Sequence, residues 1–201
     1  MTVLLQINAS ISHHEGQSSR LADQFVAAFK ARNPDAKIVL RDVAAADAVP
    51  HLDGHRFGAF TARPEDRTAE QHAVVAYSDA LIDEIRQADV IVLGLPMYNF
   101  GLPSQLKAYF DHIARAGVTF KYTEKGAVGL LGGRKVYVFA ARGGKYAGTP
   151  LDTQTGHVRD FLRFLGIEDV EFIYAEGLAM GTQSKETSLA KAAAEIARLA
   201  A

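Results

Sequence analysis

The sequence has no cysteine among its 201 residues. Disulfide bonds, thiolate metal sites and cysteine nucleophiles are therefore excluded. Neither sign of charge dominates, since 22 lysines and arginines stand against 23 aspartates and glutamates, which gives a net charge of −1. With no basic block in the chain, the sequence gives no electrostatic reason to expect nucleic acid or an anionic membrane as a partner.

Long apolar segments are also missing. The opening, Met-Thr-Val-Leu-Leu-Gln-Ile-Asn, has no basic segment and is too short for a signal peptide or a membrane span. We therefore expect a cytoplasmic protein with no membrane partner. The chain contains no repeat or low-complexity tract, and 48% of its residues are hydrophobic. It is long enough for one well-filled core, so we predict a single domain over residues 1–201.

Several familiar motifs are absent as well. The sequence has no GxGxxG fingerprint, no Walker loop ending in Gly-Lys-Ser/Thr, no HExxH and no GxSxG. Leu-Asp-Gly between His51 and His55 disfavours a helix, and we predict no metal site. His112 lies on a predicted helix and is expected at the surface. The spacing supports no acid–base or nucleophile constellation, so we predict no catalytic side chain, and a cofactor would carry any chemistry.

Apolar runs of strand length alternate with helical patterns. The strand-like runs are Val3–Ala9, Lys37–Val43, Val90–Leu95, Lys135–Ala141 and Val170–Ala175. Apolar stripes at helical spacing cover residues 21–29, 74–85, 106–113, 158–165 and 189–199. This alternation predicts an α/β fold with helices on both faces of a parallel sheet. Right-handed crossovers with five strands favour the flavodoxin-like order 2-1-3-4-5, and a six-stranded dinucleotide fold is less favoured.

Two connections are too long for ordinary links between elements. Residues 44–69 and residues 116–134 both contain aromatic side chains. Long excursions in a compact domain are usually lids, binding loops or oligomer contacts, so we expect one of these roles for each.

Ligands of open α/β sheets bind at the carboxyl ends of the strands, where the strand order reverses. The loop after the first predicted strand reads Ser10-Ile-Ser-His-His-Glu-Gly-Gln-Ser-Ser-Arg. Hydroxyls, a glycine and a new helix N-terminus together suit a phosphate. The alternative is that Ser18 or Ser19 only caps the helix.

The loop after the third predicted strand reads GLPMYNFGLPS over residues 94–104. Pro96 and Pro103 stiffen its ends, and Gly101 permits a conformation closed to other residues. Between them, backbone N–H groups lack ladder partners and lie among apolar side chains. A planar heteroaromatic ring with carbonyl oxygens would use both features. The alternative is a hydrophobic plug over the core, or a dimer contact.

The loop after the fourth predicted strand begins Ala141-Arg-Gly-Gly-Lys-Tyr. Arg142 could neutralise negative charge on a ligand, and Gly143-Gly144 could bring backbone N–H groups close to it. Taken alone, this is an ordinary glycine turn. The predicted topology brings the three loops to one place, and that coincidence favours a binding site.

These motifs, in this order, resemble those of the FMN-dependent azoreductases, also described as FMN-dependent NADH:quinone oxidoreductases. The resemblance extends over essentially the whole chain. It is carried by Ser10 with Gln17-Ser18, Pro96–Phe100, Pro103-Ser104, Leu106-Lys107, Gly117–Phe120 with Tyr122, Arg142–Gly144, Phe164–Ile167 and Ala175–Gly177.

The resemblance implies a flavodoxin-like homodimer with one FMN per subunit near the interface. It implies an enzyme that transfers two electrons, as a hydride, from NADH or NADPH to quinone, azo or nitroaromatic acceptors. If donor and acceptor use the same open face of the flavin, they must alternate, which gives ping-pong kinetics. The main alternative is a non-enzymatic, flavodoxin-like electron carrier; a flavin-free binding module is a third.

The resemblance also assigns residues. The FMN phosphate would be held by Ser10, Gly16, Gln17 and Ser18. Along the isoalloxazine ring, with the Asn99 N–H at N5, would lie Met97, Tyr98, Asn99 and Phe100. The pyrimidine end would contact Ala141, Arg142, Gly143 and Gly144. As a separate hypothesis, the opposite, substrate-facing wall could come from the partner subunit, through Phe120 and Tyr122 or through aromatic side chains of residues 44–69. The family often has a hydroxyl residue where Ala141 stands, so that side-chain hydrogen bond is missing here. The sequence leaves the choice between NADH and NADPH and the physiological acceptor open.

Overall fold

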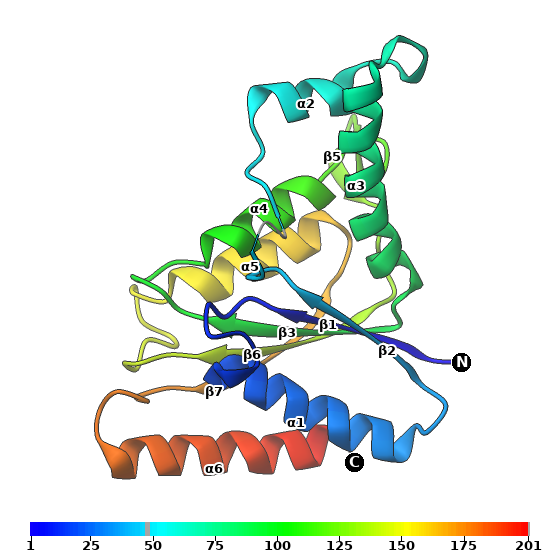
Figure 1. Ribbon diagram of the computed structural model, residues 1–201. Coiled ribbons are helices and arrows are strands. Elements are labelled where there is room, and N and C mark those ends of the chain that lie inside the picture. The colour runs from blue at the N-terminus through cyan, green and yellow to red at the C-terminus, as the bar shows by residue number, and fades with distance from the viewer. Residues whose placement is uncertain (47–48, 201) are drawn as a thin grey trace.

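The computed structural model describes residues 1–46 and 49–200. Its centre is a parallel sheet in the order β2-β1-β3-β6-β7 (Figure 1). The strands of this sheet are β1 (Val3–Asn8), β2 (Lys37–Asp42), β3 (Val90–Pro96), β6 (Lys135–Ala141) and β7 (Asp169–Ala175). Because β6 and β7 are the fourth and fifth strands of this sheet, the predicted order 2-1-3-4-5 agrees with it, and the predicted runs match the strands to within one residue at each end.

Helices cover both faces of the sheet. α1 (Gln17–Arg32) and α6 (Thr182–Leu199) lie on one face, and α3 (Ala69–Gln87), α4 (Ser104–Ile113) and α5 (Thr153–Phe164) lie on the other (Figure 1). Successive residues of a strand point to opposite faces, so Leu4 packs in the core under α1 and α6, whereas Leu5 packs in the core under the other three helices. A hydrophobic core therefore lies on each face of the sheet. The central strand, β3, pairs with β1 on one side and with β6 on the other.

The two long connections contain structure that the sequence did not predict. Residues 44–69 include α2 (Gly54–Thr61) and a 3-10 turn, η2 (Pro64–Asp66); residues 47 and 48 of this connection lie outside the described part. The Asp53 side chain caps α2 by accepting the Arg56 N–H at 2.8 Å. Because the helix begins only after Asp53, His51 and His55 do not share a helical face.

Residues 116–134 form an antiparallel hairpin of β4 (Phe120–Thr123) and β5 (Gly126–Gly129). The hairpin packs against the end of α5, where a Cβ added to Gly129 would lie 2.0 Å from the backbone nitrogen of Gly166. Only glycine permits so close an approach between the two backbones. The connection therefore runs from the end of α4 to the amino end of β6, and its hairpin packs beside the carboxyl end of α5, away from the loops of the predicted site.

The prediction that His112 lies at the surface is wrong. The side chain is fully buried, with Nδ1 3.0 Å from the Ala108 carbonyl oxygen and the rings of Tyr77 and Phe60 packed edge-on against it at 5.4 and 6.1 Å. The sequence did not reveal α2, whose Phe60 covers this part of α4. Burial lowers the pKa of His112, and Arg56 acts in the same direction, although the Ala108 carbonyl opposes them.

This histidine makes the stability of the protein depend on pH. An unfolded histidine takes up a proton near pH 6.5, whereas the buried imidazole does so only at lower pH. Below about pH 6.5 the unfolded state therefore binds more protons, and the free energy of unfolding falls as the pH is lowered. We expect His112→Phe to reduce the difference in unfolding free energy between neutral and mildly acidic urea titrations. An unchanged difference would contradict this prediction.

Candidate functional site

The carboxyl ends of β1, β3 and β6 lie at one edge of the sheet, to the left in Figure 1, where the strand order reverses between β1 and β3. Three segments leave the sheet there. They are the first loop (residues 9–16), which leads to α1, the second loop (residues 97–103), which leads to α4, and the third loop (residues 142–152), which leads to α5. The topology thus brings together the three loops that the sequence singled out.

The first loop presents the N-terminus of α1 with polar groups that have no partner. After a 3-10 turn, η1 (His13–Glu15), the helix begins behind Gly16, and no side chain caps it. The hydroxyls of Ser18 and Ser19 are buried, and neither has a hydrogen-bond partner in the described part of the chain. The interpretation that these serines only cap the helix is therefore wrong. A buried hydroxyl without a partner is unfavourable, and a ligand that accepts its proton removes that penalty.

Gly16 and Ser10 lie in contact at the entrance to this helix. A Cβ on Gly16 would lie 2.1 Å from the Ser10 Oγ. The Ser10 hydroxyl accepts the Ser12 N–H at 3.2 Å and lies 3.3 Å from the hydroxyl of Tyr98. Glycine at position 16 thus leaves the serine in place at the helix N-terminus, where an anion is favoured by the free N–H groups and the helix dipole.

The second loop begins with a tight turn at residues 98–101. The N–H of Tyr98 donates to the Gly101 carbonyl at 3.2 Å, and the N–H of Gly101 donates back at 2.9 Å. Asn99 and Phe100 occupy the left-handed region with φ of 50° and 65°, as the central residues of a two-residue hairpin turn do. The residues in the unusual conformation are therefore these two and not Gly101, as the sequence had suggested. The Asn99 N–H has no partner among the described residues and is free for a ligand.

The side chain of Tyr98 joins the second loop to the first. Its hydroxyl accepts the Ile11 N–H at 3.1 Å. At the base of the same loop, the Met97 N–H donates to the Ala141 carbonyl at 3.2 Å, which extends the pairing of β3 with β6 by one bond. The side chain of Ala141 is buried, and the residue contacts the second loop through this backbone carbonyl. The second loop is thus hydrogen-bonded to the first loop and to the end of β6, from which the third loop begins.

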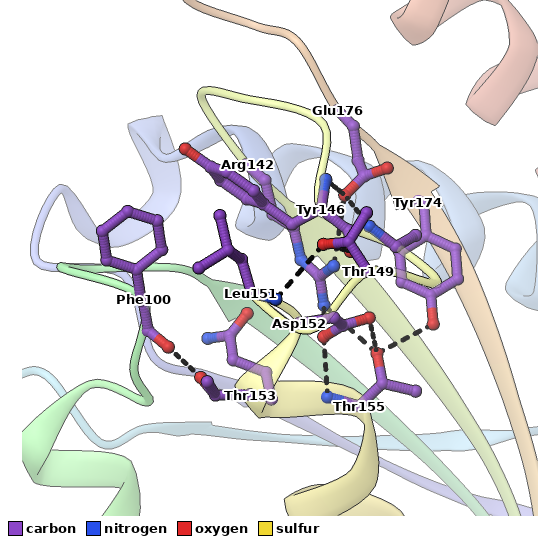
Figure 2. A network of polar contacts seen from close by, with 12 residues as sticks. Phe100, Arg142, Tyr146, Thr149, Leu151, Asp152, Thr153, Thr155, Tyr174 and Glu176 are labelled. Atoms are coloured by element: carbon purple, nitrogen blue, oxygen red, sulfur yellow. Dashed lines mark hydrogen bonds and ion pairs between the residues drawn. The ribbon is translucent and has the colours of Figure 1, made fainter.

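Arg142, at the start of the third loop, is fully buried. Figure 2 shows its guanidinium between two carboxylates, with Nη2 2.7 Å from Asp152 and Nη1 3.1 Å from Glu176. Nη2 also donates to the Thr155 hydroxyl at 3.2 Å, and the group lies 5.0 Å from the ring centre of Tyr174. The hypothesis that this guanidinium neutralises the charge of a ligand is wrong, because its charge is already balanced inside the protein.

The two carboxylates hold the surrounding backbone. Glu176 accepts the N–H groups of Tyr146 and Ala147, both at 2.9 Å, and so fixes the middle of the third loop (Figure 2). Asp152 caps α5 by accepting the Thr155 N–H at 3.1 Å. Burial alone would raise the pKa of Asp152, but the hydrogen bonds from Arg142 and Thr155 outweigh it, and this pKa lies below its ordinary value. The sequence reasoning missed both carboxylates, since neither stands in a recognisable motif.

A hollow of about 260 Å³ lies between the second and third loops. It is lined by Met97, Asn99, Phe100, Gly143, Gly144 and Tyr146. Five of these six were predicted from the sequence. Tyr146 was missed; its ring packs against that of Phe100 with the centres 5.4 Å apart. The hollow thus combines an aromatic and thioether lining with exposed backbone, as a planar polar ring requires.

A larger hollow of about 560 Å³ lies on the other side of the third loop, against β7 and α6. It contains none of the predicted residues. Several of its polar groups are already paired, such as the hydroxyl of Ser188, which accepts the Glu176 N–H at 2.8 Å. Size alone does not make it the better candidate, because the unpartnered hydroxyls belong to the first turn of α1 and the unpartnered N–H of Asn99 belongs to the second loop.

Phe120 and Tyr122 do not join these residues within one chain, because their hairpin packs beside the carboxyl end of α5, whereas the third loop leads to its amino end. Phe120 is buried, with its ring 4.3 Å from that of Phe164. Tyr122 lies beside it and is 74% exposed. Of the two, only Tyr122 presents its side chain to solvent, where a second molecule can reach it.

Among the residues that the structure describes, no group of three or more histidine, aspartate or glutamate side chains is arranged to hold a metal ion. None of the described helices is both long enough and apolar enough to cross a membrane.

In comparisons with known proteins, the matching family model and the similar relatives agree with each other. A family model described as having a flavodoxin-like fold matches residues 2–200. An FMN-dependent NADH:quinone oxidoreductase of Cellvibrio japonicus is 58% identical over 191 residues, which cover 95% of this chain and 96% of the relative. A protein of the same name, numbered 6, from Burkholderia lata is 56% identical over 197 residues, which cover 98% and 99% of the two chains.

Solved structures are similar over the full length. The azoreductase from Bacillus anthracis strain Sterne superposes with a TM-score of 0.91 at 29% identity and covers 100% of this chain and 99% of its own. An FMN-dependent NADH-azoreductase from Bacillus anthracis strain Ames Ancestor, solved in complex with FMN, has a TM-score of 0.88 at 28% identity and covers 100% of both chains.

The ion pairs of Arg142 make a clear prediction for stability. Arg142→Met keeps much of the volume but leaves the carboxylates of Asp152 and Glu176 buried without their counter-charge. Breaking a buried ion pair in this way costs about 3–5 kcal/mol, so we expect a loss of that order in urea unfolding. Arg163→Met, which removes an exposed guanidinium from the same helix that Asp152 caps, should change the unfolding free energy little. Equal losses in the two variants would refute the assignment.

Proposed function

Because the chain belongs to the flavodoxin-like family of the FMN-dependent NADH:quinone oxidoreductases, we propose that it is itself such an enzyme. It would bind FMN and pass two electrons, as a hydride, from NADH or NADPH to quinones and to azo or nitroaromatic compounds. The observation that carries this proposal is the pair of buried, unpartnered hydroxyls at the N-terminus of α1, next to a hollow lined for a planar ring.

The first loop fits the phosphate of FMN. Ser18 and Ser19 would each donate a hydroxyl proton to phosphate oxygens, and the free N–H groups at the start of α1, including that of Gln17, favour the same anion. Ser10 lies at the same entrance, held by contact with Gly16. A phosphate thus satisfies buried donors that nothing in the described part of the protein satisfies.

The second and third loops fit the flavin ring. When bound, FMN supplies the chemistry by taking up a hydride and releasing it to the acceptor. The side chains of Met97 and Phe100 supply apolar contact for the ring, and the free Asn99 N–H is the donor that the resemblance assigns to N5. Backbone N–H groups of Gly143 and Gly144 would meet the pyrimidine end. Fixed donors of this kind stabilise the negative charge that the ring gains on reduction.

A second copy of the chain would complete the site. Tyr122 is exposed on the β4–β5 hairpin, and we propose that it lies opposite the flavin of the partner subunit. The ring of Phe120 packs against that of Tyr122 and is itself buried against Phe164. The homodimer and the cytoplasmic location stay predictions of the sequence.

An electron carrier is the alternative function. Carriers of the flavodoxin type are strongly acidic, whereas this chain has a net charge of −1, and it devotes two long connections to structure outside the sheet. Slow oxidation of NADH in the presence of a quinone would favour the carrier. Rapid turnover favours the enzyme.

The phosphate assignment is tested by Ser18→Ala. If the Ser18 hydroxyl donates to a charged phosphate, its loss should weaken FMN binding by roughly 10- to 100-fold. Riboflavin, which lacks the phosphate, provides the control: its affinity should be the same for the wild-type protein and the variant. Fluorescence titration of the apoprotein measures both affinities, and an equal effect on the two ligands would sink the assignment.

The catalytic proposal is tested by steady-state kinetics on the FMN-loaded protein. Donor and acceptor would use the same open face of the ring in turn, so reciprocal plots against NADH at several quinone concentrations should be parallel. Intersecting lines would contradict the ping-pong scheme and leave the activity intact. Purified protein that neither contains FMN nor takes it up would overturn the proposed function itself.

A further inference from the structure

The first turn of α5 holds the tight turn of the second loop from behind. Gln154 is fully buried, and its Nε2 donates to the carbonyl oxygens of Pro96 at 2.8 Å and Gly101 at 2.9 Å. The neighbouring Thr153 donates its hydroxyl to the Phe100 carbonyl (Figure 2). Two adjacent side chains therefore bind three carbonyls of one short segment, at its start and at its end.

The held segment has a conformation that it would not keep alone. Asn99 and Phe100 are both left-handed, and this region is unfavourable for residues with a Cβ, more so for phenylalanine than for asparagine. Such a backbone persists where the surrounding structure holds it in place, and it is concentrated at ligand sites. Gln154 bonds the end of β3 at Pro96 and the end of the turn at Gly101, and thereby fixes the distance between these two carbonyls.

The polar amide of Gln154 is better explained by its hydrogen bonds to this segment than by packing alone. Because both partners are carbonyl oxygens, only the amide NH₂ can face them, and both of its hydrogens are used. The Oε1 of the same amide is buried and has no partner among the described residues. An apolar side chain of similar length would fill the space without that unfavourable acceptor. The glutamine is therefore explained by the two bonds that it makes.

Gln154 is itself fixed by the buried ion pairs. It lies two residues after Asp152, the residue that caps α5 and that Arg142 binds at 2.7 Å. Arg142 also binds Glu176, which holds the N–H groups of Tyr146 and its neighbour in the third loop. A continuous set of bonds thus connects the second loop, through α5, to the third loop, and both loops line the same hollow.

We propose that Gln154 is a positioning residue for the bound flavin: it sets the turn that presents the free Asn99 N–H, and through that turn it tunes flavin affinity and reduction potential. This inference rests on the proposed function. Gln154 reaches the ring only through the backbone of the second loop, since its side chain is directed to Pro96 and Gly101.

The test compares Gln154→Met with a matched control, Gln183→Met. Gln183 is the second residue of α6, as Gln154 is the second residue of α5, but its side chain is exposed and, among the described residues, bonds only Thr187 on its own helix. The FMN dissociation constant is measured by fluorescence titration of the apoprotein. The absorbance spectrum and the two-electron midpoint potential of the bound flavin are measured as well, and urea unfolding of the apoprotein records stability.

For Gln154→Met we expect an FMN dissociation constant raised about tenfold or more, since two hydrogen bonds are lost. The midpoint potential should fall, because a loosened turn offers a poorer donor to the reduced ring. The bound-flavin spectrum should change with it. Gln183→Met should match the wild-type protein in all three readouts. A variant that loses stability but keeps the wild-type potential and spectrum would overturn the proposal, because a purely structural role has that result.

A second variant decides the case if Gln154→Met does not fold. Thr153→Val removes only the bond to the Phe100 carbonyl, from an exposed side chain. It should shift the flavin potential in the same direction by a smaller amount, and unchanged flavin binding and potential would overturn the proposal. Wild-type protein that binds no FMN would refute the proposed function; wild-type binding with unaltered variants refutes the positioning role alone.

Discussion

A guanidinium with no exposed surface is the interaction on which the carboxyl edge of this sheet depends. Arg142 takes a full charge into the interior, where an isolated ion is highly unfavourable. It is acceptable only because Asp152 and Glu176 meet it there. These three residues come from the ends of β6 and β7 and the start of α5. The ion pairs therefore determine how three elements of the fold meet at the site.

At this edge of the sheet, some polar groups have hydrogen-bond partners within the protein and others do not. Several groups that face the protein are bonded: the carboxylates to Arg142, the second loop to α5, and the Tyr98 hydroxyl to the first loop. Among the described residues, the groups without a partner include the hydroxyls of Ser18 and Ser19 and the backbone N–H of Asn99, and also two groups inside the protein, Nε of Arg142 and Oε1 of Gln154. A site of this kind is rigid before its ligand arrives, so binding does not have to order the loops. Preorganised donors are also the arrangement that stabilises a charge developing on a ring.

The sequence predicted the sheet well because its signals are local. Each strand is a short apolar run, and the handedness of the crossovers leaves few possible orders. The site loops could be found because they follow strand ends. The role of each residue within those loops could not be predicted from its position after a strand. Arg142 looked free because its partners lie 10 and 34 residues further on. The carboxylates of Asp152 and Glu176 could be recognised as its partners only once the structure placed the start of α5 and the end of β7 next to the end of β6.

Other errors have the same origin in tertiary contacts. Gly101 was the natural candidate for a left-handed backbone, but the turn places Asn99 and Phe100 there and relies on α5 to hold them. His112 looked exposed because α2, a short helix containing two glycines, gave no helical signal of its own. The role proposed for Tyr122 requires a second molecule, about which the intramolecular packing of one chain carries no information.

The distance along the chain between Arg142 and Glu176 has a consequence for synthesis on the ribosome. The charge of Arg142 acquires its second carboxylate only after 34 further residues have been added. Until that segment has left the exit tunnel, the third loop lacks the bonds that fix it, although β1, β2 and β3 are already present. A nascent chain can therefore form part of the sheet early, but the edge that carries the proposed site is completed only after the segment with Glu176 has emerged.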